Sequence, residues 1–210
     1  IFLKPKATNI ETTIPVNGLP EDIIIDGDYL WATIPMNSDW TDASTVVKID
    51  INSNTIIETI EVGPGPQEIT EHNGDIYVSR TFYNTEDWTA RHGATKIIGS
   101  QQIIKQDFGS GGSCGGSILS FQSNIYRSFE GGIARMDNSL NLDLDNKIGN
   151  IDQSLVLYNV EEINGNIWFA IVDKDYSDWS EVRIIDLDGN EVANYEVGIL
   201  PGDFAYWKSE

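Results

Sequence analysis

The chain has 210 residues, of which 40% are hydrophobic and 10% aromatic, and this composition excludes wholesale disorder and predicts one or two folded domains. The 33 acidic and 13 basic residues give an acidic protein of net charge −20, which argues against nucleic acid and anionic membranes as partners. The single cysteine, Cys114, excludes an intrachain disulfide, and no apolar run approaches the ~20 residues that membrane insertion requires. Because the chain begins at Ile1 without Met, we expect a processed or trimmed start, for which a removed signal peptide is one explanation.

Four short turn sequences recur along the chain and predict hairpins. They are DGD at 26–28, NGD at 73–75, QSN at 122–124 and NGN at 164–166, each between two short runs of β-type residues. Their spacing indicates a repeat of about 45 residues, which is typical of four-stranded propeller blades. We name the four strands of each repeat A to D in chain order.

The repeats predict an all-β fold, a single β-propeller of five blades of four antiparallel strands. The first four blades are placed at about 19–63, 64–111, 112–150 and 151–198. The last blade combines both ends, because 1–18 resembles strands C and D of the first repeat and 200–207 resembles strand A. We therefore expect 199–210 plus 1–18 to close the ring as a three-stranded blade without strand B, which would remove open sheet edges.

An aromatic residue occupies the same position on each predicted strand B, with a small residue two positions later. This large-then-small pattern is typical of packing between blades, so we expect the aromatic residues in the core. The aromatic residues are Trp31, Tyr77, Tyr126 and Trp168, and the small residues are Thr33, Ser79, Ser128 and Ala170.

One stretch carries a family resemblance. TIIETIEVGPGPQEITEHNGDIYVSRTF at 55–82 resembles the YVTN-type β-propeller repeat, and 17–35 and 164–173 are similar at lower fidelity. The resemblance covers four of the five units, and the third unit, with GSGGSCGGS at its start, departs most. It implies a secreted, periplasmic or cell-surface location and a binding or scaffold role.

The tripeptide Asp-Trp-Thr/Ser occurs three times, at 39–41, 87–89 and 178–180, always between strands B and C. Because successive strands of a blade reverse direction, the B–C loops and the D–A connections lie on one face. A Trp ring beside a carboxylate suits a sugar, so we predict a ligand-binding face there. The predicted contacts are Trp40, Trp88, Trp179, Asp39, Asp87, Asp178, Arg80, Arg91, Arg127 and His92. The alternative is structural: the Asp organises a turn and the Trp seals the gap between blades.

These observations favour a secreted, non-catalytic protein that binds a small polar ligand or a glycan. The alternatives are a scaffold or subunit that packs on a protein partner and, with less support, a hydrolase or lyase at the channel mouth around Cys114. Asp22, Glu68 and Asp203 form a predicted ring of acids that fits a cation or water site better than an acid/base pair. We predict no catalytic residue, no metal site and no cofactor, with structural calcium in the oxygen-rich 141–150 or 173–181 as an alternative.

Overall fold

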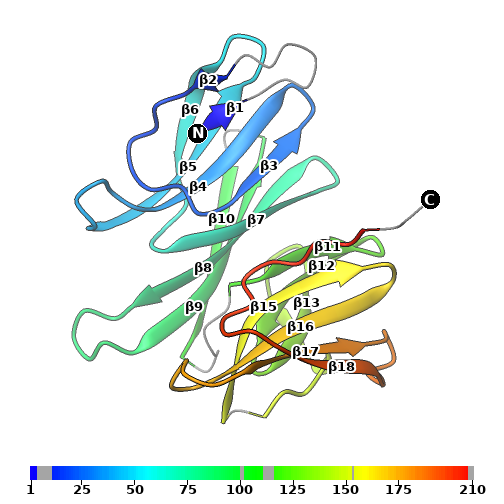
Figure 1. Ribbon diagram of the computed structural model, residues 1–210. Helices are drawn as coiled ribbons and strands as arrows, with labels where there is room; N and C mark the ends of the chain where they lie inside the picture. Colours follow the sequence, from blue (N-terminus) through cyan, green and yellow to red (C-terminus); the bar gives the residue numbers. More distant parts are fainter. Residues whose placement is uncertain (4–10, 100–101, 111–115, 153, 208–210) are drawn as a thin grey trace.

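The computed structural model describes residues 1–3, 11–99, 102–110, 116–152 and 154–207. These residues form β-strands joined by turns and loops (Figure 1). No helix among them has the length and apolarity needed to cross a membrane.

Four sheets of four antiparallel strands follow one another along the chain, and in each sheet the strands pair in chain order. Blade 1 contains β3 (Ile23–Asp26), β4 (Tyr29–Met36), β5 (Asp42–Asp50) and β6 (Thr55–Glu61). Blade 2 contains β7 (Pro66–His72), β8 (Asp75–Tyr83), β9 (Ala90–Ile98) and β10 (Gln102–Gly109). Blade 3 contains β11 (Ile118–Phe121), β12 (Asn124–Phe129), β13 (Gly132–Met136) and β14 (Leu142–Ile148). Blade 4 contains β15 (Leu155–Ile163), β16 (Asn166–Asp173), β17 (Ser180–Ile185) and β18 (Glu191–Val197). The predicted all-β propeller class and the A-to-D assignment of these strands are confirmed.

Two-residue turns join strands A and B in every one of these blades, as the turn sequences predict. Asn73 and Gly74 both have positive φ, of 53° and 83°, which is the backbone of the hairpin turn that Asn-Gly favours. Gln122 and Ser123 adopt the same conformation, with φ of 47° and 59°, although neither is glycine. The tight turns keep strands A and B in register.

The hydrophobic core consists of layers between successive blades. Trp31 of β4 packs with Ile69 and Val78 of blade 2, and Tyr77 of β8 packs with Ile118 of blade 3. Tyr126 of β12 belongs likewise to the layer shared with blade 4. Each of these aromatic residues is therefore covered by the blade that follows it, as predicted.

Trp168 of β16 is only half-buried, so it differs from the other three predicted core residues. The blade position that follows blade 4 holds the C-terminal segment 199–207, which forms no strand. Within this segment Phe204 contacts Trp168 edge-on, with 5.7 Å between the ring centroids. One aromatic side chain covers Trp168 less completely than a whole sheet would.

The two ends of the chain lie against different blades. β1 (Phe2–Leu3) and β2 (Thr12–Thr13) pair only with each other, and the following Ile14 is buried on blade 1 with Leu30 and Val47. The C-terminal segment lies against blade 4, where Asn159 Nδ2 donates to the Gly202 carbonyl oxygen. No strand pairing joins the two ends among the described residues, so the predicted three-stranded closing blade does not form there. The physical reason is that strands A and C of a blade are not neighbours, and the strand B that would pair with both has no counterpart.

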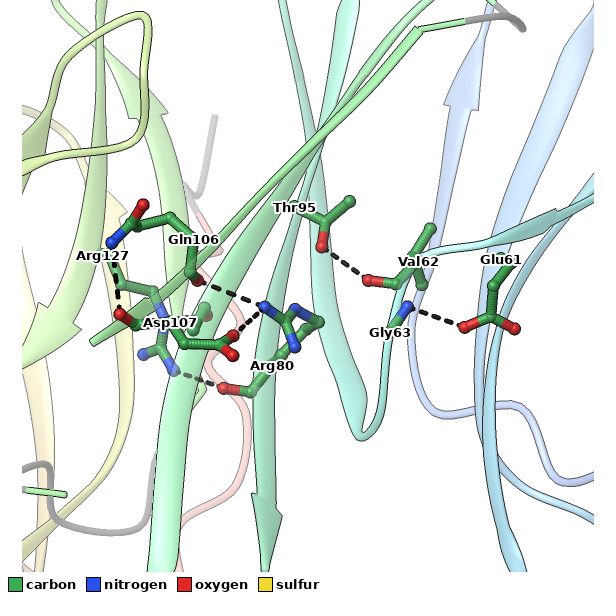
Figure 2. A network of polar contacts seen from close by, with 9 residues as sticks. Glu61, Val62, Gly63, Arg80, Thr95, Gln106, Asp107 and Arg127 are labelled. Atoms are coloured by element: carbon green, nitrogen blue, oxygen red, sulfur yellow. Dashed lines mark hydrogen bonds and ion pairs between the residues drawn. The ribbon is translucent and has the colours of Figure 1, made fainter. Parts of the chain in front are cut away.

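Buried arginines link blade 3 to blade 2 (Figure 2). Arg127 of β12 is fully buried and donates from Nη1 to the Ser128 carbonyl (2.7 Å) and from Nη2 to the Arg80 carbonyl of β8 (3.3 Å). Arg80 in turn donates to the Gln106 carbonyl at 3.2 Å and forms an ion pair with Asp107. Burial lowers the pKa of Arg127 to about 10, with Glu68 opposing and Arg80 adding to the shift, so Arg127 remains a cation at neutral pH.

The connection between blades 1 and 2 is held in a similar way. Thr95 Oγ1 of β9 donates to the Val62 carbonyl at 2.7 Å, and the Gly63 amide donates to Glu61 Oε1 at 3.0 Å (Figure 2). These bonds satisfy polar groups at the seam where a hydrophobic layer meets the loop face.

We predict that Arg127→Met lowers the free energy of unfolding by about 2–4 kcal/mol, because buried carbonyl groups lose their charged donor. Chemical denaturation followed by fluorescence measures the change. The matched control is Arg135→Met, which removes an arginine whose side chain is 54% exposed and whose ion pair with Asp143 spans 3.5 Å. We expect the control to change the free energy by less than about 0.5 kcal/mol, and equal effects of the two variants would contradict a special role for Arg127.

Candidate functional site

Three adjoining cavities lie on the face that carries the B–C loops. The axial cavity, of about 450 Å³, is lined by Glu21, Asp22, Glu68, Ile118, Leu119, Asn159, Glu161, Gly202 and Asp203. The aromatic groove, of about 480 Å³, is lined by Leu19, Glu21, Pro35, Met36, Trp40, Asp42, Gly65, Gln67, Thr81, Phe82 and Tyr83. The arginine pocket, of about 350 Å³, is lined by Phe82, Tyr83, Asn84, Thr85, Arg91, Asp107 and Gly109. Glu21 lines the first two cavities, and Phe82 and Tyr83 line the last two, so the three cavities form a continuous run.

The axial cavity is surrounded by strands A, and its acids link each strand A to the next. Asp22 Oδ2 accepts from the Ile69 amide of blade 2 at 2.8 Å, and Glu68 Oε2 accepts from the Ile118 amide of blade 3 at 3.1 Å. Two further bonds of the same kind follow: Ser117 Oγ accepts from the Val160 amide of blade 4 at 2.9 Å, and Glu161 Oε1 accepts from the Phe204 amide at 3.2 Å. The C-terminal segment thus takes the place of a further strand A.

The predicted ring of acids is real in its geometry, since Asp22, Glu68 and Asp203 all line the axial cavity. Burial raises the pKa of Glu68 to about 7, although bonds from Ser117 and Ile118 act in the opposite direction. Burial also raises the pKa of Asp22, with Asp203 adding to the shift. The pKa of Glu161 is raised by burial and by the hydrogen bond that it shares with Asp203. Burial thus shifts the pKa of all three carboxyl groups in the same direction, and the largest shift is that of Glu68.

Trp40 borders the aromatic groove in an unusual backbone conformation. Its φ is +66°, in the left-handed region where a bulky residue costs roughly 1–2 kcal/mol relative to an ordinary position. The Trp40 amide donates to the Asn37 carbonyl at 3.0 Å and the Asn37 amide donates to Thr41 at 2.8 Å, which defines a three-residue hairpin loop with a left-handed last position. Glycine is the usual residue there, so the turn itself does not require tryptophan.

Two other turns of the same type show what this position ordinarily holds. In the C–D turn of blade 4, Gly189 has φ +86° and donates to Asp186. In the C–D turn of blade 3, Leu140 has φ +68° and donates to Asp137, and its side chain is completely buried in the core. Gly189 thus avoids the strain because it has no side chain, and Leu140 offsets the strain by burying its side chain. Trp40 does neither, because 74% of its surface is exposed.

Trp88 repeats the left-handed conformation and the exposure of Trp40 in blade 2, but its loop is one residue longer, because the closing bonds join Asn84 to Trp88 and Thr89. Its φ is +57°, its amide donates to the Asn84 carbonyl at 2.9 Å, and 76% of its surface is exposed. Trp179 is also exposed, but the left-handed residue of its loop is Tyr176, so the third copy of the tripeptide forms a different turn. The alternative in which these indoles seal the gap between blades is not what the structure shows.

The carboxylates of the tripeptides are used by the turns themselves. Asp39 Oδ1 accepts from both the amide and the hydroxyl of Thr41, and Asp87 Oδ1 accepts from the same two groups of Thr89. The hydroxyl bond is the main cause of the lowered pKa of each aspartate. Asp178 Oδ1 accepts from the Trp179 amide at 2.8 Å. The turn chemistry that the sequence offered as an alternative is present in the first two loops, whereas in the third loop Asp173 accepts from the amides of Asp175, Ser177 and Asp178.

The predicted basic contacts divide into one surface residue and three buried ones. Arg91 lines the arginine pocket. Arg80, Arg127 and His92 are each at most 2% exposed, because their positions point into the layers between blades, and His92 packs edge-on against Phe129. A ligand on the loop face would meet at most 2% of the surface of any of these three residues, and their binding role stays a prediction.

Sequence reasoning missed the residues that complete the aromatic groove. None of the other repeats has the same residue at the position of Glu21, Asp42 or Tyr83. A search for residues that recur with the repeat therefore does not find them. The groove forms where the B–C loop of blade 1 meets the end of strand B of blade 2, and only the folded arrangement places them together. Cys114 lies outside the described residues. Among the described residues no three His, Cys, Asp or Glu side chains are grouped to hold a metal ion.

We predict that Glu68 makes the protein less stable as the pH rises. Its pKa in the folded state, about 7, exceeds the ordinary 4.5, so the folded state binds the proton more tightly, and the stability present below pH 4.5 is lost as the pH approaches 7. The pKa difference between the folded and unfolded states corresponds to a change of roughly 3 kcal/mol in the free energy of unfolding. Between about pH 4.5 and pH 8 the free energy of unfolding should therefore fall by this much more in the wild type than in Glu68→Gln. Parallel pH profiles of the two proteins would show that Glu68 titrates normally.

The chain matches no protein-family model and no curated protein at a significant level. Solved structures with a similar fold include an exo-β-1,3-galactanase from Clostridium thermocellum, with TM-score 0.62 and 11% identity over 96% of this chain. They also include the dihydro-heme d1 dehydrogenase NirN (TM-score 0.58, 12% identity, 94% of this chain) and a chain of the nidogen/laminin complex (0.54, 13%, 94%). This chain spans 42% of the NirN chain, 52% of the galactanase chain and 75% of the nidogen/laminin chain. At these identities the likeness concerns the fold alone, and the fold is that of a β-propeller.

Proposed function

We propose that this protein is a non-catalytic, secreted or cell-surface propeller that binds a glycan on its B–C loop face, with the aromatic groove as the centre of the site. The observation that carries the proposal is the exposed, left-handed Trp40 at the edge of a cavity of about 480 Å³. A strained backbone without compensating burial is an indication of a role outside folding. The location follows from the YVTN-type resemblance and is part of the proposal.

The chemistry of the groove suits a sugar. Trp40 and Tyr83 present exposed aromatic surface, onto which the C–H face of a sugar ring stacks with little loss of side-chain entropy. Glu21 and Asp42 supply carboxylate oxygens that accept hydrogen bonds from hydroxyl groups. Since the axial cavity and the arginine pocket adjoin the groove, the site has room for a chain of several sugars.

A second candidate function is hydrolysis of such a chain in the axial cavity. It is favoured by Glu68, whose pKa of about 7 suits a general acid at neutral pH. Both oxygens of Glu68 accept hydrogen bonds from blade 3, which is what a linking role requires. We therefore place binding ahead of hydrolysis, and the release of reducing sugar from the glycans tested below decides between the two.

We predict that Trp40→Gly abolishes glycan binding without loss of stability. Titration of an oligosaccharide panel, followed by the fluorescence of the remaining tryptophans and by calorimetry, should show affinity for at least one glycan in the wild type and at least a tenfold loss in the variant. Glycine relieves the left-handed strain, so the free energy of unfolding should stay constant or rise by up to about 1 kcal/mol.

The chain provides a matched control in Leu140, which occupies the same turn position with a buried side chain. Leu140→Gly should lower the free energy of unfolding by about 2–4 kcal/mol, because the loss of buried apolar surface outweighs the stability gained from relief of backbone strain. Destabilisation by Trp40→Gly of similar size would assign Trp40 a structural role. Unchanged glycan affinity in Trp40→Gly would remove the groove from the binding site.

A further inference from the structure

We infer that the aromatic groove recognises a protonated amino group, so that its ligand is a cationic amino sugar. This inference rests on the proposed function of the same site and narrows its ligand class. It comes from four features: the sign of the charges in the groove, carboxylates that no described residue engages, exposed aromatic faces, and the field of the neighbouring cavity.

The charges in the groove are all negative. The described residues that line it include Glu21 and Asp42 but no lysine, arginine or histidine. An anionic ligand would meet only repulsion there. A neutral sugar would use the carboxylates as hydrogen-bond acceptors, whereas an ammonium group would gain the charge interaction as well, and charge-assisted bonds are roughly twice as strong as neutral ones.

Neither carboxylate of the groove is engaged by the described part of the protein. Their main-chain groups are bonded, as in the bond from the Glu21 amide to the Thr33 carbonyl and the bond from Asn37 Nδ2 to the Asp42 carbonyl. Among the described residues no hydrogen bond or ion pair reaches either carboxylate. This separates them from Asp39 and Asp87, whose oxygens hold the loops. Glu21 and Asp42 are thus available to a ligand cation.

The aromatic residues of the groove add a second attraction for a cation. The faces of Trp and Tyr rings attract a cation within about 6 Å of the ring centre. Trp40 is 74% exposed and Tyr83 55% exposed, both on the groove. Phe82, between them and the arginine pocket, already carries the Arg80 guanidinium at 5.3 Å from its centroid, so a cation–aromatic contact exists beside the groove.

The axial cavity supplies the longer-range field. Glu21 lines both cavities, and beyond it the axial cavity holds Asp22, Glu68, Glu161 and Asp203. Together with the net charge of −20, the ionised members of this group concentrate cations at the loop face and speed their association, whereas Glu68, with a pKa of about 7, adds little charge at pH 6. The field acts on a cationic sugar and has no effect of this kind on a neutral one.

The test compares three tetrasaccharides that differ only in the group on C2 of each sugar unit: the glucosamine tetramer (amine), the N-acetylglucosamine tetramer (acetamide) and cellotetraose (hydroxyl). Calorimetry at pH 6 and low salt should give an affinity for the glucosamine tetramer at least about tenfold higher than for the other two. The preference should shrink as salt rises to about 0.5 M, where screening shortens the reach of the charges. It should also shrink at pH 9, where the amine loses its proton.

Variants assign the preference to the groove. Glu21→Gln and Asp42→Asn should each lower the affinity for the glucosamine tetramer by about three- to tenfold, the range expected for one charge-assisted contact. Each should lower the affinity for cellotetraose by a smaller factor, because the amide oxygen of Gln or Asn still accepts a hydrogen bond from a hydroxyl group but carries no charge. The matched control is Asp188→Asn, which removes an exposed acid from the C–D turn of blade 4 on the opposite face and should change neither affinity. Thermal unfolding confirms that all three variants are folded.

The outcomes separate this inference from the proposed function. If cellotetraose binds as tightly as the glucosamine tetramer, and Trp40→Gly removes both, the ammonium inference is overturned and glycan binding stands. If no tetrasaccharide binds but tetramethylammonium or a lysine-rich peptide does, with loss in Glu21→Gln, the cation site stands and the glycan proposal is overturned. If none of these probes binds, both are overturned.

Discussion

The architecture depends on the bonds that run around the axis from one strand A to the next. Asp22, Glu68 and Glu161 each accept an amide of the following unit, and Ser117 takes the same part between blades 3 and 4. Because these groups are partly or fully removed from water, an unpaired amide or carboxylate at any of them would be costly, and the bonds hold the strands at a common depth. The raised pKa of Glu68 is the electrostatic consequence of placing a carboxyl group in this position.

Holding the strands A at the axis separates the two faces of the molecule. The A–B connections on one face are tight two-residue turns, whereas the B–C loops of blades 1, 2 and 4 on the other face span five or six residues and differ from one another. Trp40 and Tyr83 come from neighbouring blades and border the same groove. The groove is therefore a property of the seam between two blades and belongs to neither of them alone.

The exposed tryptophans show how a repeat can carry a binding residue on a structural device. The Asp and Thr of the tripeptide close the turn, as Asp39 and Thr41 do at 2.6 Å, and this chemistry is complete without the tryptophan between them. The internal comparison with Gly189 and Leu140 separates the two roles, because the same backbone occurs with no side chain and with a buried one. The indole is thus the part of the motif that folding does not explain.

The sequence by itself determined the propeller class, the strand order within each blade and the face on which the loops emerge, because strand period and turn chemistry are local properties of the chain. It also predicted that Trp40 and Trp88 belong to that face. Only the tertiary structure decided that Arg80, Arg127 and His92 are buried, that Trp168 is half-covered and that no strand pairing joins the described residues of the two ends. It alone brought Glu21, Asp42 and Tyr83 to one groove. These outcomes depend on which blade covers which side chain, and contacts between residues far apart in the chain leave no local pattern in it.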